Sequence, residues 1–397
     1  MEWRQRTIEK ITYISYQSQI KALLNHAKYK KIAIWGAGVR GILTGIILED
    51  LRVKDFIFID SDVKRQGSRL NGHLIEPFAK VNINEYYIIL SMEYQDSTKN
   101  KLLELGLKEG RDFVGLYSYS YDEMINELKQ NLHNATLIVG SSNIHIMPLE
   151  ERMQEDLAEI IKKKYSNCIK ILGSTCLGMR NMYYLIRTEM YRNPNLKNVV
   201  ILVNWETLTS YHDDLPRTQK PQLIKSLQEY VHCLGGEQLA MELAKEWELA
   251  IEKAEDYGLE NAYSPSRLDS NKESSEALKK YLQLSVMEDL CFDCGEILFL
   301  TKILKELSKE SVNVDLVIEP MNMELGKELC GDDFEKVCGQ KYAFIENLAK
   351  EYGVSCYNAT DLLDSKQYVA INMVSEALYS EGRNKFADYI IQIIESR

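Results

Sequence analysis

The chain of 397 residues has no long stretch rich in lysine or arginine, and its 48 basic residues are outnumbered by 59 acidic ones, giving a formal net charge of -11. Such a charge repels phosphate backbones and acidic headgroups, so we expect no nucleic-acid partner and no acidic membrane partner. The chain also has no apolar stretch of membrane-spanning length, and residues 1–6 lack the apolar core of a signal peptide. From these absences we expect a cytoplasmic protein without membrane insertion.

Metal-binding cysteine patterns are also missing. The eight cysteines are scattered, and Cys291 and Cys294 form the one pair at ligand spacing. A zinc site needs a second pair of ligands, but Cys330 and Cys338 lie far downstream and have the wrong spacing. Free cysteines are often buried core residues. We therefore interpret these thiols as structural and expect no metal.

What the chain does contain is enough apolar sequence, 45% of its residues, for real hydrophobic cores. Its length predicts two or three domains, and no internal repeat is evident. Changes in pattern predict N-terminal helices, an α/β nucleotide-binding domain, a linker helix and a larger α/β domain. Their expected bounds are 1–28, 29–118, 119–133 and 134–397.

The first α/β region begins with an apolar strand, residues 31–35, that leads directly into a glycine-rich turn. Gly36, Gly38 and Gly41 open a helix, and a second strand ends on Asp60, about 20 residues beyond the last glycine. Glycines allow a tight turn and a close backbone approach, and the amino terminus of the following helix can hold a phosphate. This order of elements predicts a Rossmann-like unit that binds a nucleotide through these glycines and Asp60.

The same region resembles the small nucleotide-binding domains of bacterial sugar-modifying and capsule-building proteins. The matching segments are Gly36–Gly38, Ile59–Asp62 and Leu70–Gly72. The resemblance implies a nucleotide or nucleotide-sugar ligand. The alternative is that the glycines only pack the helix against the strand. A third strand at 86–91 completes half of a dinucleotide fold, which argues against hydride transfer.

The second region is organised around residues 135–145, where an apolar strand leads into a turn with two serines. Apolar residues recur at helical spacing from Met147 to Ile160, which predicts a helix after the turn. A strand, a Gly-Ser-Ser turn and a helix would place Ser142 at the carboxyl edge of a sheet, where open α/β sheets bind ligands.

Strands and helices then alternate, which predicts a parallel sheet between helical layers. The expected strands are 135–139, 168–172, 198–203, 314–319 and 354–357. The stretch 219–310 departs from this alternation, because it is rich in helix and contains a polar patch at 263–275. We interpret it as a helical insertion or cap over the sheet edge.

Four short motifs in this order resemble the SGNH, or GDSL-type, hydrolase and acyltransferase superfamily. They are Gly140–Ser142, Gly173, Asn204 and the closing Gly382–Ala387, and the resemblance covers residues 134–397. It implies an SGNH-like three-layer α/β/α fold with Ser142 as the nucleophile of an esterase or acyltransferase. The oxyanion would be held by the serine's own N–H, the Gly173 N–H and the Asn204 side chain. The Gly-Ser-Ser variant is similar to acyl-transfer proteins of the D-alanyl-transfer type, and the implied substrate is an acylated glycan or glycoconjugate.

Each of these assignments has an alternative. Ser142, or either of its neighbours in sequence, could instead cap the helix, because Ser and Asn are preferred caps. The donating N–H could belong to Thr175 or Cys176 rather than to a glycine. A different alignment puts Glu206 at the position of Asn204, and an ionised carboxylate cannot donate a hydrogen bond.

The closing motif departs from the family pattern. The expected Asp-x-x-His-Leu falls on residues 374–378, where Val374 and Ala377 replace the acid and the histidine. Neither side chain can carry a proton, and the last histidine of the chain is His232. The usual triad is therefore absent from this alignment.

Three groups could replace the missing base. His145 follows the serine by three residues, His212 lies beside Asp213 and Asp214 after the third strand of this region, and Glu376 could serve if burial raised its pKa. Without a base, the fold would keep only its pocket, and the protein would be a non-catalytic nucleotide-sugar-binding or scaffold protein of a bacterial polysaccharide pathway. The sequence thus predicts a small-molecule or glycan substrate and leaves the oligomeric state open.

Overall fold

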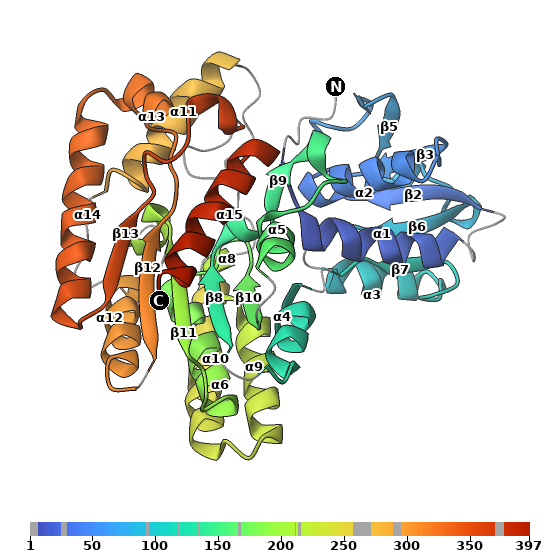
Figure 1. Ribbon diagram of the computed structural model, residues 1–397. Coiled ribbons are helices and arrows are strands. Elements are labelled where there is room, and N and C mark those ends of the chain that lie inside the picture. Colours follow the sequence, from blue (N-terminus) through green and yellow to red (C-terminus); the bar gives the residue numbers. More distant parts are fainter. Residues whose placement is uncertain are drawn as a thin grey trace. The chain divides into compact units, whose positions relative to one another are not determined.

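The computed structural model describes residues 7–24, 30–92, 95–117, 120–132, 135–165, 168–210, 212, 216–256, 271–288, 295–310, 312–369 and 377–397. The chain divides into two compact units, Met1–Tyr119 and Ser120–Arg397 (Figure 1). Most of the expected polar patch, residues 263–270, and the pair Cys291 and Cys294 lie outside the described residues. Among the helices that are described, none is long and apolar enough to cross a membrane.

The first unit is built on a sheet that, within its described residues, has six strands in the order β4-β5-β3-β2-β6-β7. Neighbouring strands are parallel except β4 and β5. The strands are β1 (Thr7–Glu9), which lies outside this sheet, β2 (Lys31–Trp35), β3 (Phe56–Ile59), β4 (Arg69–Leu70), β5 (His73–Glu76), β6 (Tyr86–Leu90) and β7 (Phe113–Gly115). The helices are α1 (Lys10–Leu24), α2 (Val39–Asp50) and α3 (Asp96–Glu104), with short 3-10 turns η1 (Phe78–Lys80) and η2 (Ile83–Glu85).

The strand order of this sheet reverses between β2 and β6. In chain order the parallel strands β5, β3, β2, β6 and β7 are third, second, first, fourth and fifth, which is the order of doubly wound dinucleotide-binding sheets. The strands expected at 31–35 and 86–91 are confirmed as β2 and β6, which are apolar because helices cover both faces of a parallel sheet. β5 and β7 extend the sheet beyond the expected half unit.

The second unit holds a sheet of five described strands, all parallel, in the order β10-β8-β11-β12-β13. The strands are β8 (Thr136–Gly140), β10 (Ile169–Gly173), β11 (Asn198–Val203), β12 (Asn313–Ile318) and β13 (Ser355–Asn358), and β9 (Ile146–Pro148) lies outside the sheet. Each of the five expected strands is present within one residue at either end. In chain order the sheet is second, first, third, fourth, fifth, so it reverses between β8 and β11.

Helices cover both faces of this sheet (Figure 1). Side chains of β11 alternate between two cores, with Val199, Ile201 and Val203 in one and Val200 and Leu202 in the other. The first core includes residues of α4, α6, α9, α10, α11, α12 and α14, and the second those of α5 and α15. The helices are α4 (Ser120–Lys129), α5 (Leu157–Lys164), α6 (Met179–Arg192), α8 (Pro216–Gln219), α9 (Pro221–Cys233), α10 (Glu237–Asp256), α11 (Asn271–Leu284), α12 (Gly295–Leu307), α13 (Met323–Cys330), α14 (Asp333–Glu351) and α15 (Ser380–Glu395). The second unit is therefore a three-layer α/β/α arrangement.

Helices α8 to α12 lie between β11 and β12 in sequence, where the helical insertion at 219–310 was expected. The expected linker helix at 119–133 is α4, and it packs with the second unit against β10 and α9. It is thus part of the core of that unit rather than a free connection.

The prediction of a helix directly after the Gly-Ser-Ser turn is wrong. The chain instead forms η3 (Ser142–Ile144), β9 and η4 (Leu149–Glu151) before α5 begins at Leu157. Pro148 lacks an N–H group and disfavours helical backbone in the residue before it, so a helix cannot run through Met147. α5 begins where Asp156 and Glu159 form a capping box.

Candidate active site

Several residues that the sequence singled out lie at the carboxyl edge of the second sheet. Ser142 follows β8 and Asn204 follows β11, and these two strands are neighbours. The strand order reverses between them, and such a point of reversal opens a crevice beyond the strand ends. Open α/β sheets bind ligands in that crevice, so Ser142 and Asn204 lie where a ligand is expected.

Ser142 is the first residue of η3 and is buried. Its hydroxyl oxygen lies 3.5 Å from that of Ser141. Ser141 occupies the N-cap position of η3, but its side chain makes no capping hydrogen bond. The capping alternative is therefore not realised at Ser141, and Ser142 lies inside the turn rather than at its cap.

His145 follows η3 and forms a buried pair with Asp156. The His145 Nδ1 lies 2.9 Å from Asp156 Oδ2, while Asp156 Oδ1 accepts the Glu159 N–H at the start of α5. Because the helix cap fixes the carboxylate, the carboxylate in turn fixes the ring, and it favours the tautomer with the proton on Nδ1. The Nε2 of His145 is then left as a basic nitrogen. Within the described chain, the Asp156 contact is the one hydrogen bond of this ring, so no bond to Ser142 is present.

Asn204 joins Asn143 at a single carboxylate oxygen. Glu319 Oε2 accepts Asn143 Nδ2 at 2.8 Å and Asn204 Nδ2 at 3.2 Å. Glu319 follows β12 directly, so these side chains come from the ends of three adjacent strands, β8, β11 and β12. The Oδ1 of Asn204 accepts the Glu206 N–H at 3.0 Å, which caps η5 (Trp205–Leu208). Asn204 therefore donates one of its two amide hydrogens to Glu319.

Burial raises the pKa of Glu319 to about 7, with a smaller contribution in the same direction from the charge of Glu206. The hydrogen bonds from Asn143 and Asn204 act in the opposite direction, because they stabilise the ionised form. Among the described residues, nothing hydrogen-bonds to the other carboxyl oxygen, Oε1. The Oε2 of Glu206 also accepts the Tyr281 hydroxyl at 2.5 Å. Asn204 is thus linked to the serine turn through Glu319, which also accepts a hydrogen bond from Asn143.

Gly173 ends β10, next to β8. A Cβ atom at this position would lie 2.5 Å from Ile144 Cδ1 in η3, so glycine is needed for the serine turn to pack against the strand. Cys176 lies in the loop before α6 and adopts a left-handed backbone, with φ of 55°. The observed role of Gly173 is packing. That its N–H also donates a hydrogen bond to an oxyanion stays a prediction.

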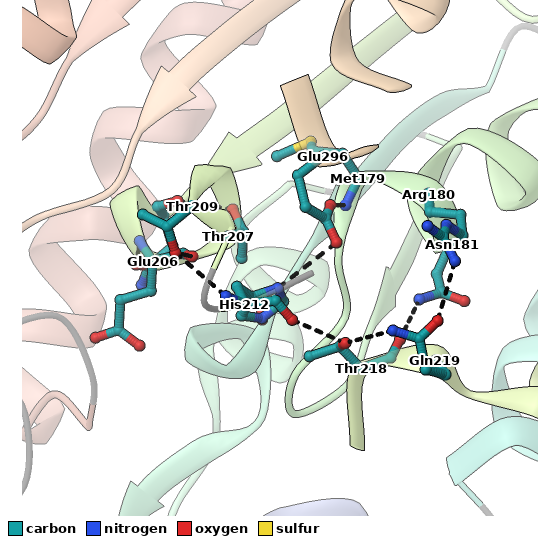
Figure 2. Close-up of polar contacts among 12 residues, drawn as sticks. Met179, Arg180, Asn181, Glu206, Thr207, Thr209, His212, Thr218, Gln219 and Glu296 are labelled. Carbon is teal, nitrogen blue, oxygen red and sulfur yellow. Dashed lines mark hydrogen bonds and ion pairs between the residues drawn. The ribbon is translucent and has the colours of Figure 1, made fainter. Parts of the chain in front are cut away.

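His212 is buried, but its ring contacts a different part of the unit. Its Nδ1 lies 3.6 Å from Glu296 Oε1, and Glu296 Oε2 accepts the Met179 N–H at the start of α6 (Figure 2). The Thr218 hydroxyl donates to the His212 carbonyl oxygen at 2.9 Å. His212 is therefore tied to α6 and α12, and no hydrogen bond between described residues links it to Ser142. Its neighbours Asp213 and Asp214 lie outside the described residues.

The position expected for the family histidine is occupied by Ala377, which is buried shortly before α15. Its φ of 62° is in the left-handed region, and its carbonyl oxygen accepts the Val369 N–H at 3.0 Å. Val374 and Glu376 lie outside the described residues. A methyl side chain at 377 supplies no base.

The glycine turn of the first unit lies where the strand order reverses, at the end of β2. Gly36 has φ of 106°, and a Cβ on Gly41 would lie 1.8 Å from the Gly36 carbonyl oxygen, so packing alone requires Gly41. Gly38 is the N-cap of α2 without a side-chain capping bond, and a Cβ there would meet nothing within 4 Å. Asp60 follows β3, and its two carboxylate oxygens accept the N–H groups of Ala37 and Asp62, both at 2.8 Å.

Two residues of the candidate site in the second unit, Asp156 and Glu319, were not predicted as site residues. Asp156 had a signal, because an acid three residues before Glu159 and an apolar run marks a capping box. Glu319 ended an expected strand, but its contact with Asn143 spans 176 residues of sequence. No periodicity could have indicated that contact.

The described residues hold no group of three or more His, Cys, Asp or Glu side chains that could bind a metal ion. No protein-family model and no curated protein matches this chain. Two solved structures of catalytic mutants of Axe2, an acetylxylan esterase from Geobacillus stearothermophilus, are 11% and 10% identical to it, with TM-scores of 0.33 and 0.35. They cover 66% and 67% of this chain and 95% and 96% of their own.

LAE5, an alpha/beta hydrolase enzyme from the metagenome of Lake Arreo, Spain, is 8% identical, with a TM-score of 0.30, and the match covers 66% of this chain and 95% of that one. Likeness at these scores assigns neither a family nor an activity.

Proposed function

We propose that the second unit is an SGNH-like ester hydrolase or acyltransferase that acts on an acylated glycan or glycoconjugate, with Ser142 as nucleophile. The observation that supports this proposal is the arrangement of three side chains at the carboxyl edge of the second sheet. Ser142 and Asn204 follow neighbouring strands at the reversal point of the sheet, and a carboxylate-held imidazole, His145, follows the serine by three residues. A nucleophile, an oriented base and an amide donor are the groups that acyl transfer requires.

In the proposed reaction, His145 Nε2 takes the hydroxyl proton of Ser142 while Oγ bonds to the ester carbonyl carbon. The carbonyl oxygen becomes an oxyanion, which the second amide hydrogen of Asn204 would stabilise. The intermediate then loses the alcohol oxygen of the glycan, which takes the proton from His145. Water or an acceptor hydroxyl attacks the acyl-serine by the same steps and restores Ser142. The bond between nucleophile and base often forms only in the substrate complex.

Labelling with a fluorophosphonate, which reacts with activated serines, tests this proposal. We expect labelling of the wild-type protein, none in Ser142→Ala, and unchanged labelling in the matched control Ser141→Ala. His145→Gln should slow labelling by about 100-fold or more, because the base is lost. Labelling retained in Ser142→Ala would contradict the proposed nucleophile. An unlabelled but folded wild-type protein would favour the alternative, a non-catalytic binding or scaffold protein of a polysaccharide pathway.

We also propose that the first unit is Rossmann-like and binds a nucleotide or nucleotide-sugar. Two observations favour it: the glycine turn follows the first strand of a sheet in the order third, second, first, fourth, fifth, and the N-cap of α2 has no side-chain bond. Asp60 already accepts two backbone N–H groups, so we assign it to holding the turn rather than to the ribose.

Titration calorimetry with uridine diphosphate and its sugar conjugates tests the second proposal. Gly38→Val should abolish binding, because the added side chain projects into open space beside the turn, where the phosphates would approach. The fold should tolerate it, since no atom lies within 4 Å of the added Cβ. No binding by the wild-type protein, or equal binding by the variant, would contradict a nucleotide site here.

A further inference from the structure

Glu319 connects the ends of three adjacent strands through one oxygen atom. Its Oε2 accepts hydrogen bonds from Asn143 in η3 and from Asn204 at the end of β11. Asn143 is the neighbour of the proposed nucleophile, and Asn204 is the proposed side-chain donor to the oxyanion. Each amide is oriented by Glu319 through one of its N–H groups.

The surroundings of the Glu319 carboxyl group stabilise a negative charge poorly. It is 2% exposed, and within the part of the chain that the structure describes its Oε1 has no hydrogen-bond partner. A buried carboxylate is usually paired with a cation or surrounded by several donors. Here the two donors are neutral amides on one oxygen, and the charged group that acts on Glu319 is another carboxylate, Glu206 of η5. This surrounding favours the neutral, protonated form.

The charge on Glu319 matters to the proposed reaction because of where it would lie. An ionised Oε2 lies 3.2 Å from the amide nitrogen that would stabilise the oxyanion. Two negative charges sharing one donor repel each other strongly in a buried site, where water screens them little. A protonated carboxyl group keeps the hydrogen bonds of Oε2 to both amides without opposing the oxyanion.

We propose that Glu319 is the positioning residue for the amides of Asn143 and Asn204, and that acyl transfer at Ser142 proceeds while its carboxyl group is protonated. This proposal rests on the proposed function of the second unit. It assigns Glu319 no contact with the substrate.

The direction of the pH dependence follows from the surroundings of Glu319. Among the described residues, the groups that act on it are Asn143 from η3, Asn204 from the end of β11 and Glu206 from η5, whose carboxylate accepts the Tyr281 hydroxyl of α11. Burial and the charge of Glu206 raise the pKa of Glu319 to about 7. The protonated fraction, and with it the rate, therefore falls about tenfold for each pH unit well above that value.

The test compares fluorophosphonate labelling of Ser142 in the full chain of wild type and Glu319→Gln from pH 5 to 9. Glutamine can accept both amides through its carbonyl oxygen but cannot ionise. The ratio of the wild-type labelling rate constant to that of Glu319→Gln should be constant below about pH 6 and fall about tenfold per pH unit above about pH 8. Other groups titrate in both proteins, so their effects cancel in this ratio. Glu296→Gln, at a buried glutamate away from the serine turn, is the matched control and should keep the wild-type profile.

A second variant leaves Glu319 in place. Glu206→Gln removes the neighbouring negative charge, so the pKa of Glu319 should fall and the descending limb of the profile should move to lower pH. An unmoved limb in this variant, or a constant ratio across the pH range, would overturn the proposal while leaving Ser142 as the nucleophile. Absence of Ser142-dependent labelling in the wild type at every pH would overturn the proposed function and this proposal together.

Discussion

At the scale of the residue, the carboxyl group of Glu319 makes the stability of the second unit depend on pH. Its pKa is raised from an ordinary 4.5 to about 7, so the folded protein holds a proton that the unfolded chain releases between these values. The contribution of this group to stability is therefore fully present below about pH 4.5, and it is lost as the pH rises through about 7. A shift of this size corresponds to on the order of 3 kcal/mol.

We predict that the unfolding free energy of the wild type, relative to that of Glu319→Gln, falls by on the order of 3 kcal/mol between about pH 4.5 and pH 8. Urea unfolding at several pH values measures this difference, and Glu296→Gln controls for the loss of another buried carboxyl group. A difference that stays constant with pH would show that Glu319 titrates normally.

Sequence reasoning succeeded or failed at this scale according to distance along the chain. His145 was named as a candidate because it is near Ser142 in sequence, and its partner Asp156 lies only 11 residues further on. Asn204 and Glu319 are 115 residues apart, and their contact depends on β11 and β12 being neighbours. A single sequence does not reveal that adjacency before the strand order is known.

At the scale of the element, the strands were predictable because buried parallel strands are short, continuous apolar runs. β11 was predicted at its observed bounds, 198–203. The region after the serine turn was not, because apolar residues from Met147 to Ile160 fit a helical spacing although Pro148 interrupts the backbone. Periodicity reports which side chains are buried, and it does not by itself distinguish one helix from two turns followed by a helix.

The glycine turn of the first unit gives a prediction at this scale. Gly41→Ala should destabilise the first unit by several kcal/mol, because the added Cβ would lie 1.8 Å from a backbone oxygen that cannot move without distorting the turn. Gly38→Ala is the matched control and should cost about 1 kcal/mol or less, since its Cβ meets open space and only a cap residue changes. Thermal unfolding followed by circular dichroism compares them, and equal effects would contradict the crowding inferred at Gly41.

At the scale of the whole molecule, the chain holds separate hydrophobic cores. The two large cores of the sheet at β8 to β13 are formed by residues of the second unit, and a core around Ala33 and Phe113 is formed by the first. Each sheet also has its own reversal point with its own candidate site. The two proposed functions are therefore separable by experiment.

We predict that residues 120–397 expressed alone fold cooperatively and keep Ser142-dependent labelling, because the contacts of Ser142, His145 and Glu319 described above lie within this unit. Urea unfolding and labelling of this fragment, with its Ser142→Ala variant as control, measure both properties. A fragment that does not unfold cooperatively would show that the second unit requires the first for its stability.

The shared acceptor at Glu319 also affects the chemical ageing of the protein. Asparagine side chains lose their amides slowly by deamidation, and the loss of either amide would put a second carboxyl group against Glu319 Oε2. Two carboxyl groups at that distance cannot both ionise, so one would have to keep its proton up to high pH. The burial and hydrogen bonds that hold Asn143 and Asn204 oppose the backbone attack that deamidation requires, and so they protect the chemical lifetime of the site.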